Sequence, residues 1–169
     1  MNRGRSIFFS LVTILLMLAA HAPAQSKPGI LSADELKKAV PGSYYFDGQS
    51  APVQMRNAGG FRVDDRKLVL AAMVDTSGYA ADVAAKYQGL LITSVKLDVG
   101  GSDLAPGAYG FGFSKDGKFT VMDVGGNALL SVAAQNDDTL AHPVPLKMVA
   151  DGAAYKLYAG RSYVSLKAQ

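Results

Sequence analysis

Residues 95–124, VKLDVGGSDLAPGAYGFGFSKDGKFTVMDV, contain the clearest structural pattern in the chain. Apolar and polar residues alternate over much of this stretch, as they do in strands with one face toward water. Residues 106–107 (Pro-Gly) and 116–117 (Asp-Gly) interrupt the alternation with turn sequences, because proline sets φ at the first turn position and glycine accepts a positive φ. The stretch therefore predicts three antiparallel strands joined by two turns.

The middle strand of this stretch has two unlike faces, one with three aromatic side chains and one with two glycines. A ligand or another part of the backbone approaches closely at such a bare face, or the glycines allow a strongly curved sheet to bend. We favour bending, since glycine in a strand commonly marks a bend or bulge. If a small ligand binds here, its candidate binding residues are Tyr109, Gly110, Phe111, Gly112 and Phe113.

The rest of the chain repeats this organisation, with short apolar strands between glycine, Asp-Gly and Pro-Gly turns. Lys67–Val74 is almost continuously apolar, which predicts a buried central strand. Residues 57–60 (Asn-Ala-Gly-Gly) predict a turn between two short strands, and Tyr79–Tyr87 is alanine-rich enough for two helical turns. The pattern predicts an all-β fold, a single antiparallel β-barrel or compact β-sandwich of about eight to ten strands.

A short helix is predicted before the first strand, over about Ala33–Ala39. Ser32 and Glu35 have the spacing of a capping box, in which each side chain accepts from the other residue's backbone N–H. Leu31 and Leu36 stand at the positions of a hydrophobic staple across the same helix start.

Residues 1–24 have the pattern of a signal peptide. Arg3 and Arg5 precede an apolar run, and residues 22–24 (Ala-Pro-Ala) match a cleavage site before Gln25. No cysteine follows for a lipid anchor, so we expect an exported protein, periplasmic or secreted. We divide the chain into a signal peptide (1–24), a flexible lead-in (25–31) and a single β domain (32–169), with no membrane span after cleavage.

Composition excludes several classes of function. Removing 24 of the 169 residues leaves 145, and removing two of the 17 basic residues leaves 15 against 14 acidic ones. A nearly neutral chain without a Lys/Arg cluster does not favour nucleic-acid binding. The chain has no cysteine, and therefore no disulfide and no thiol nucleophile.

The sequence contains no recognisable catalytic motif. His142 lies near Asp137 and Asp138 in the polar loop 135–145, an arrangement compatible with a base and its orienting carboxylate. No nucleophile is identifiable beside them, and most other aspartates stand in turns, where their side chains bond the local backbone. We predict no catalytic residue, no metal site and no cofactor.

Residues 97–109, LDVGGSDLAPGAY, resemble a hairpin of uncharacterised exported bacterial proteins, in which a Gly-rich turn leads into a Leu-x-(Pro/Ala)-Gly-x-Tyr element. Residues 87–89 (Tyr-Gln-Gly) and 158–161 (Tyr-Ala-Gly-Arg) are similar to further pieces of such proteins. The resemblance covers about a third of the chain that follows the signal peptide. It implies a small exported β domain and no established activity.

Three hypotheses of function remain. The first is a non-enzymatic cell-envelope binding module for a small apolar ligand or an envelope partner, and a solidly filled interior would count against the ligand. The second is a hydrolase with an unrecognised site near His142, which requires a Ser or Thr hydroxyl within hydrogen-bond reach. The third is a structural or interaction protein that acts through exposed strand edges, for which Tyr44–Phe46 and Ser162–Lys167 are the candidates.

Overall fold

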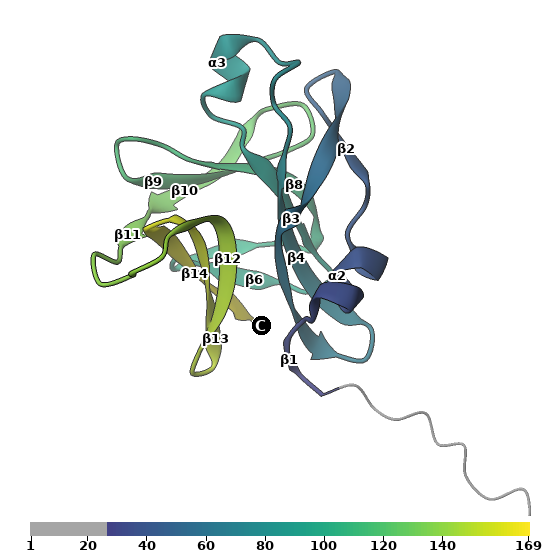
Figure 1. Ribbon diagram of the computed structural model, residues 1–169, viewed down its shortest axis with the longest axis vertical. Coiled ribbons are helices and arrows are strands. Elements are labelled where there is room, and N and C mark those ends of the chain that lie inside the picture. Colours follow the sequence, from purple (N-terminus) through teal and green to yellow (C-terminus); the bar gives the residue numbers. More distant parts are fainter. Residues whose placement is uncertain (1–26) are drawn as a thin grey trace, which may run out of the picture.

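The structure is a computed structural model that describes residues 27–169, and it consists mainly of two antiparallel β-sheets (Figure 1). The predicted signal peptide lies outside the described residues. The large sheet has the order β1-β3-β4-β5-β8-β9-β10, with β2 paired to β3, and the small sheet has the order β12-β13-β14-β6-β7, with β11 paired to β14. The all-β prediction is confirmed. The two sheets do not close into a barrel, so the sandwich is the correct alternative.

The described residues form fourteen strands and two helices. The large sheet contains β1 (Gly29–Ile30), β2 (Ser43–Phe46), β3 (Gln49–Asp64), β4 (Lys67–Val74), β5 (Gly89–Thr93), β8 (Gly107–Phe113), β9 (Lys118–Met122) and β10 (Ala128–Ala133). The small sheet contains β6 (Leu97–Val99), β7 (Ser102–Leu104), β11 (Gln135–Asn136), β12 (Val144–Asp151), β13 (Ala154–Gly160) and β14 (Ser162–Ala168). The helices are α2 (Ala33–Ala39) and α3 (Ala81–Ala84). The count exceeds eight to ten because β1, β6, β7 and β11 have only two or three residues each.

The predicted three-stranded meander over residues 95–124 is wrong in its first strand. β6 pairs with β7 and β14 in the small sheet, whereas β8 and β9 pair in the large sheet. Gly100 and Gly101 both have positive φ, 55° and 93°, and form the two-residue turn of the β6–β7 hairpin. The chain therefore changes sheets between Leu104 and Gly107.

The predicted turn at residues 57–60 is also wrong, because β3 runs through it as one strand of 16 residues. The register against β4 shifts between Val53 and Ala58, which marks a bulge. The two glycines serve close packing instead. A Cβ at Gly60 would lie 2.7 Å from the Val69 carbonyl oxygen, and one at Gly59 would lie 3.0 Å from Cβ of Met148 in the small sheet.

The predicted helix over Ala33–Ala39 is confirmed as α2, with its capping box. The Glu35 N–H donates to Ser32 Oγ (3.3 Å), and the Ser32 N–H donates to Glu35 Oε2 (2.8 Å). Leu31, at the end of the predicted lead-in, is buried and donates its N–H to the Gly60 carbonyl. Of the helix predicted over residues 79–87, only the four residues of α3 are helical. No helix among residues 27–169 is long and apolar enough to cross a bilayer.

Buried apolar residues form two clusters on opposite faces of the large sheet. Figure 1 shows the small sheet on one side of β3 and β4 and α2 on the other. The inter-sheet cluster contains Phe61, Val69, Ala71, Leu91, Val95, Leu97, Val99, Leu104, Phe111, Phe119, Val121, Leu146, Met148, Leu157, Val164 and Leu166. The outer cluster contains Leu31, Val40, Tyr44, Phe46, Ala51, Leu70, Ala72, Val74, Tyr79, Tyr87, Leu90 and Met122.

Candidate functional site

The candidate ligand residues of β8 lie in the middle of the large sheet, between β5 and β9. Phe111 is fully buried in the inter-sheet cluster, and Tyr109 and Phe113 pack against that cluster. The Tyr109 hydroxyl donates to the Ala105 carbonyl (2.9 Å) in the turn before the strand. The aromatic face of β8 is thus part of the core between the sheets.

The glycine face of β8 is filled by the protein itself. A Cβ at Gly110 would lie 2.5 Å from the Phe46 ring, and one at Gly112 would lie 1.9 Å from the Lys86 carbonyl oxygen. Residues after α3 hold this contact, since the Gln88 N–H donates to the Phe111 carbonyl (2.8 Å). Of the two explanations for a bare face, the close approach of another backbone applies at Gly112.

Gln88 strengthens the same attachment through its side chain. Its Nε2 donates to the Phe113 carbonyl (2.9 Å), and its Oε1 accepts the Phe113 N–H (3.0 Å). One amide side chain therefore pairs with the backbone of β8 much as a neighbouring strand would. This attachment leaves Gly112 covered by the chain between α3 and β5, while the Phe46 ring of β2 covers Gly110.

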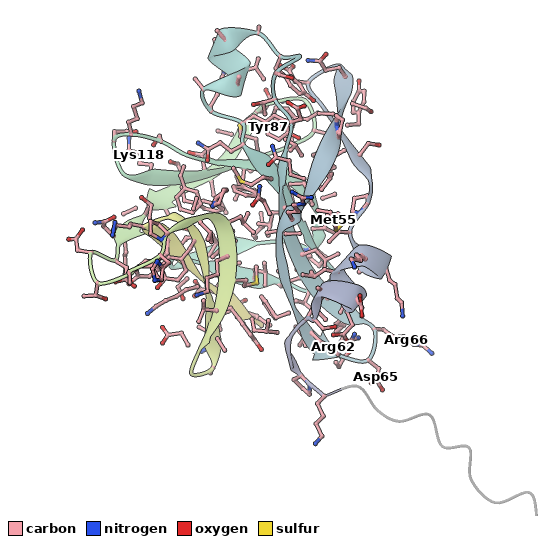
Figure 2. The ribbon with its side chains drawn as sticks, in the orientation of Figure 1. Met55, Arg62, Asp65, Arg66, Tyr87 and Lys118 are labelled. Carbon is pink, nitrogen blue, oxygen red and sulfur yellow. The ribbon has the colours of Figure 1, made fainter. Side chains whose placement is uncertain are left out.

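The outer cluster contains an aromatic group that the sequence did not single out. The Phe46 and Tyr87 rings stack with centroids 3.8 Å apart, and Tyr79 meets Tyr87 edge-on at 5.3 Å. Tyr87 lies near α3, at one end of the large sheet (Figure 2). The Tyr79 hydroxyl reaches the carbonyls of Phe46 and Gln49, both at 3.1 Å.

Two tyrosine hydroxyls of the outer cluster are buried without a hydrogen-bond partner, those of Tyr44 and Tyr87. Burial raises the pKa of Tyr44 to about 12, and it raises the pKa of Tyr87 further above its ordinary range. Both side chains pack within the outer cluster, where the Tyr79 ring is a neighbour of Tyr87.

His142 does not gain the partner that a hydrolase would need. Its side chain is exposed and makes no hydrogen bond within residues 27–169. The Asp137 carboxylate instead accepts from Thr139 (2.6 Å) and Tyr158 (3.1 Å), which lowers its pKa, and Asp138 accepts from Asn136 (2.5 Å). The histidine and the two aspartates therefore do not form one site.

Of three hollows in the described surface, two are small and the third is a groove that reaches Val164 of the inter-sheet cluster. One of about 180 Å³ lies between Phe46, Asp82 and Met122, and another of about 180 Å³ lies beside Gln49 and Tyr79. A groove of about 380 Å³ is lined by Gly100, Gly101, Val164 and residues around them. No group of three or more His, Asp or Glu side chains in residues 27–169 is placed to hold a metal ion.

The two predicted strand edges have different outcomes. Ser162–Lys167 is not an edge, because β14 is paired with β13 on one side and with β6 and β11 on the other. β2 does pair with β3 alone, but it has only four residues. The Asp47 N–H at its end donates to the Val124 carbonyl (2.8 Å), which ties this edge to the β9–β10 turn.

The longest uncharged edge among the described strands is β10, which sequence reasoning missed. It is the last strand of the large sheet, and its six residues, Ala-Leu-Leu-Ser-Val-Ala, include no charge and no proline. The Ala134 N–H donates to the Gly117 carbonyl (2.8 Å), so the backbone groups of Ser131 and Ala133 point away from β9 in the antiparallel alternation. These groups have no strand partner, and Leu129 beside them is 52 % exposed.

The other edges carry features that discourage strand pairing. β12 contains Pro145 and Lys147, and its register against β13 shifts at that point. β7 has three residues, one of them Asp103, and β1 has two residues. Proline, charge, bulges and short length are the usual means of protecting an edge, and β10 has only the bulge at Leu129. The uncharged run between Asp123 and Asp137 was the pattern in the sequence that could have identified it.

No family model, no curated protein sequence and no solved structure matches this chain.

Proposed function

We propose that the protein is exported and is a non-enzymatic interaction protein that binds an extended protein segment along the open edge of β10. The observation that carries the proposal is the unpaired, uncharged backbone edge at Ser131 and Ala133, next to exposed Leu129. Strand addition uses such an edge, because the main-chain groups supply hydrogen bonds and the side chains supply selectivity.

Packing between the sheets favours a protein partner over a small apolar ligand. Phe61, Phe111, Phe119, Leu97 and Leu157 are all fully buried there. Side chains so fully enclosed leave little room for a ligand beside them, which supports a protein partner. Export rests on the signal-peptide pattern of residues 1–24.

Strand addition is tested with a displayed library of random peptides of about ten residues, long enough to span the strand. Binding is measured at a protein concentration at which the protein is monomeric, to wild type and to Ser131→Lys. The matched control is Ser43→Lys, the same substitution on the edge of β2. We expect selected peptides to bind wild type and Ser43→Lys and to lose binding to Ser131→Lys. Peptides that bind all three proteins equally, or no selected peptide, would contradict the proposal.

Two mass measurements test the remaining parts. The intact mass of the protein recovered from the periplasm of an expression host is expected to begin at Gln25, and a protein retained at full length in the cytoplasm would contradict export. Native mass spectrometry of gently purified protein is expected to show no small adduct. A bound molecule of a few hundred daltons, released on denaturation, would restore the small-ligand hypothesis instead.

A further inference from the structure

We infer that the segment bound along β10 is β10 of a second copy of this chain, so that two large sheets join into one continuous sheet across a twofold axis at Ser131. This inference rests on the proposed function, because it names the partner of the same edge. It concerns only the β10 strand, Ala128–Ala133, and the residues that flank it.

The direction of each side chain on β10 follows from its partners on β9. Leu130 pairs with Val121 and Val132 pairs with Phe119, so both point into the inter-sheet cluster. Ser131 pairs with Thr120 on the opposite face, where the two hydroxyls lie 3.1 Å apart. The strand therefore has one apolar face and one face of small side chains.

An antiparallel copy placed with Ser131 opposite Ser131 matches these faces. Leu130 then stands beside Val132 of the partner subunit, so an apolar position continues the core layer across the junction. Exposed Leu129, in the bulge of the strand, stands at the position opposite Ala133 of the partner subunit. Ser131 and Ala133, whose backbone groups point outward, supply the hydrogen bonds of the new ladder.

Charge does not oppose this pairing. No residue between Asp123 and Asp137 is charged, so no like charges meet along the strand. Lys118 on β9, the pairing partner of Ala133, forms an ion pair with Asp116 (3.2 Å) and lies toward the outer end of the hairpin (Figure 2). A hetero-partner would need a matching segment of its own, whereas a second copy always supplies one with the same pattern.

The absence of cysteine from the sequence allows a direct test of the register. Directly opposed residues in a hydrogen-bonded antiparallel pair have Cα atoms about 5.5 Å apart, within the range of a disulfide. Ser131→Cys in the full chain is therefore expected to form a covalent dimer under mild oxidation. Ala133→Cys is the matched control, because its two copies would be at least about 13 Å apart along the strands.

Sedimentation velocity over a concentration series gives the second readout. We expect wild type to be a reversible dimer, Ser131→Ala to remain one, and Ser131→Lys to raise the dissociation constant roughly tenfold or more, since two like charges would oppose each other at the axis. Ser43→Lys is expected to leave dimerisation unchanged. Circular dichroism and thermal unfolding show whether each variant is folded.

Three results would overturn the inference. They are a monomer at every concentration with no covalent dimer from Ser131→Cys, a dimer broken by Ser43→Lys and not by Ser131→Lys, and crosslinking by Ala133→Cys in preference to Ser131→Cys. A monomer that still binds peptides along β10 would leave the proposed function standing and exclude only the second copy as the partner.

Discussion

The two faces of the large sheet are covered in different ways, one by a second sheet and the other by short separate segments. The inter-sheet cluster lies between two hydrogen-bonded sheets and contains aliphatic side chains and phenylalanines. The outer cluster lies beneath short pieces, namely α2, the β2–β3 hairpin and the chain around α3, and it contains three buried tyrosines. In a sheet, neighbouring strands provide hydrogen-bond partners for the backbone along their whole length. Short segments lack such a ladder, so each of their polar groups needs a separate partner.

The buried polar atoms on the two faces of the large sheet show the same difference, since Thr93 shares the inter-sheet face of β5 with Leu91. Thr93, the one buried polar residue of the described sheets, is satisfied within its own turn by the backbone of Val95. In the outer cluster the hydroxyls of Tyr44 and Tyr87 have no partner. A buried hydroxyl without a partner costs about 1–3 kcal/mol, so the outer cluster loses part of what its apolar burial contributes.

The largest effect is expected from Phe111→Ala in the inter-sheet cluster. Phe111 is fully buried against Phe119, with ring centroids 5.6 Å apart. Its truncation leaves a cavity that the two hydrogen-bonded sheets cannot close by moving toward each other. We therefore expect the free energy of unfolding to fall by about 3–5 kcal/mol. Chemical denaturation measures this loss. A loss below that of the outer-cluster variants would reverse the comparison.

Gly112→Ala should cause the next largest loss of stability, because it disturbs the contact between β8 and the chain after α3. Its added Cβ would meet the backbone carbonyl of Lys86, which moves only with the whole segment. We expect a loss of about 1–3 kcal/mol. Gly117→Ala is an unsuitable control because of its positive φ, whereas Gly42→Ala adds a Cβ with no atom within 4 Å and is expected to be nearly neutral.

Removing the hydroxyl should affect stability differently at two neighbouring tyrosines. Tyr79→Phe removes the donor to the carbonyls of Phe46 and Gln49, and should destabilise by about 1 kcal/mol. Tyr87→Phe removes a buried hydroxyl without a partner, and should be neutral or stabilising. Thermal unfolding of both variants at one pH provides the comparison. Equal losses from the two changes would mean that Tyr87 has a partner in solution.

The smallest effect should be the contribution of Glu35 in α2 to the loss of stability at low pH. Hydrogen bonds from the Ser32 backbone and side chain, with a further one from Arg62, lower the pKa of Glu35 from 4.5 to about 2. A lowered pKa in the folded state means that this contribution is present above pH 4.5 and is lost as the pH falls toward 2. In Glu35→Gln this part of the acid dependence of the melting temperature should disappear. An unchanged pH profile would exclude Glu35 as its source.

Local features were predictable from the sequence because local contacts produce them. The capping box of α2 needs only Ser32, Glu35 and the backbone between them, and the strand β4 needs only its own run of apolar residues. The turn between β8 and β9 was equally predictable, because residues 116–117 (Asp-Gly) favour it by themselves. The glycine pair at 59–60 was misleading, because the same residues serve either a turn or a close contact with another strand, here Met148 of β12.

The neighbour of each strand was not predictable, and the candidate site depends on it. An alternating pattern tells which residues face the core but not which strand lies alongside. The sequences of β14 and β10 are both compatible with an edge, yet β14 is in the middle of the small sheet and β10 at the end of the large one. The expected edge at Ser162–Lys167 and the overlooked edge at Ser131 have this same cause.

The central place of β14 has a consequence for how the small sheet assembles during folding. β14 connects the β6–β7 hairpin to β13, and it pairs Leu166 with Val99, a residue far away in the sequence. Until β14 takes this place, the β6–β7 hairpin has no other strand beside it in the small sheet. Contacts so distant in sequence form slowly. The small sheet is therefore expected to be completed late in folding, after the local hairpins have formed.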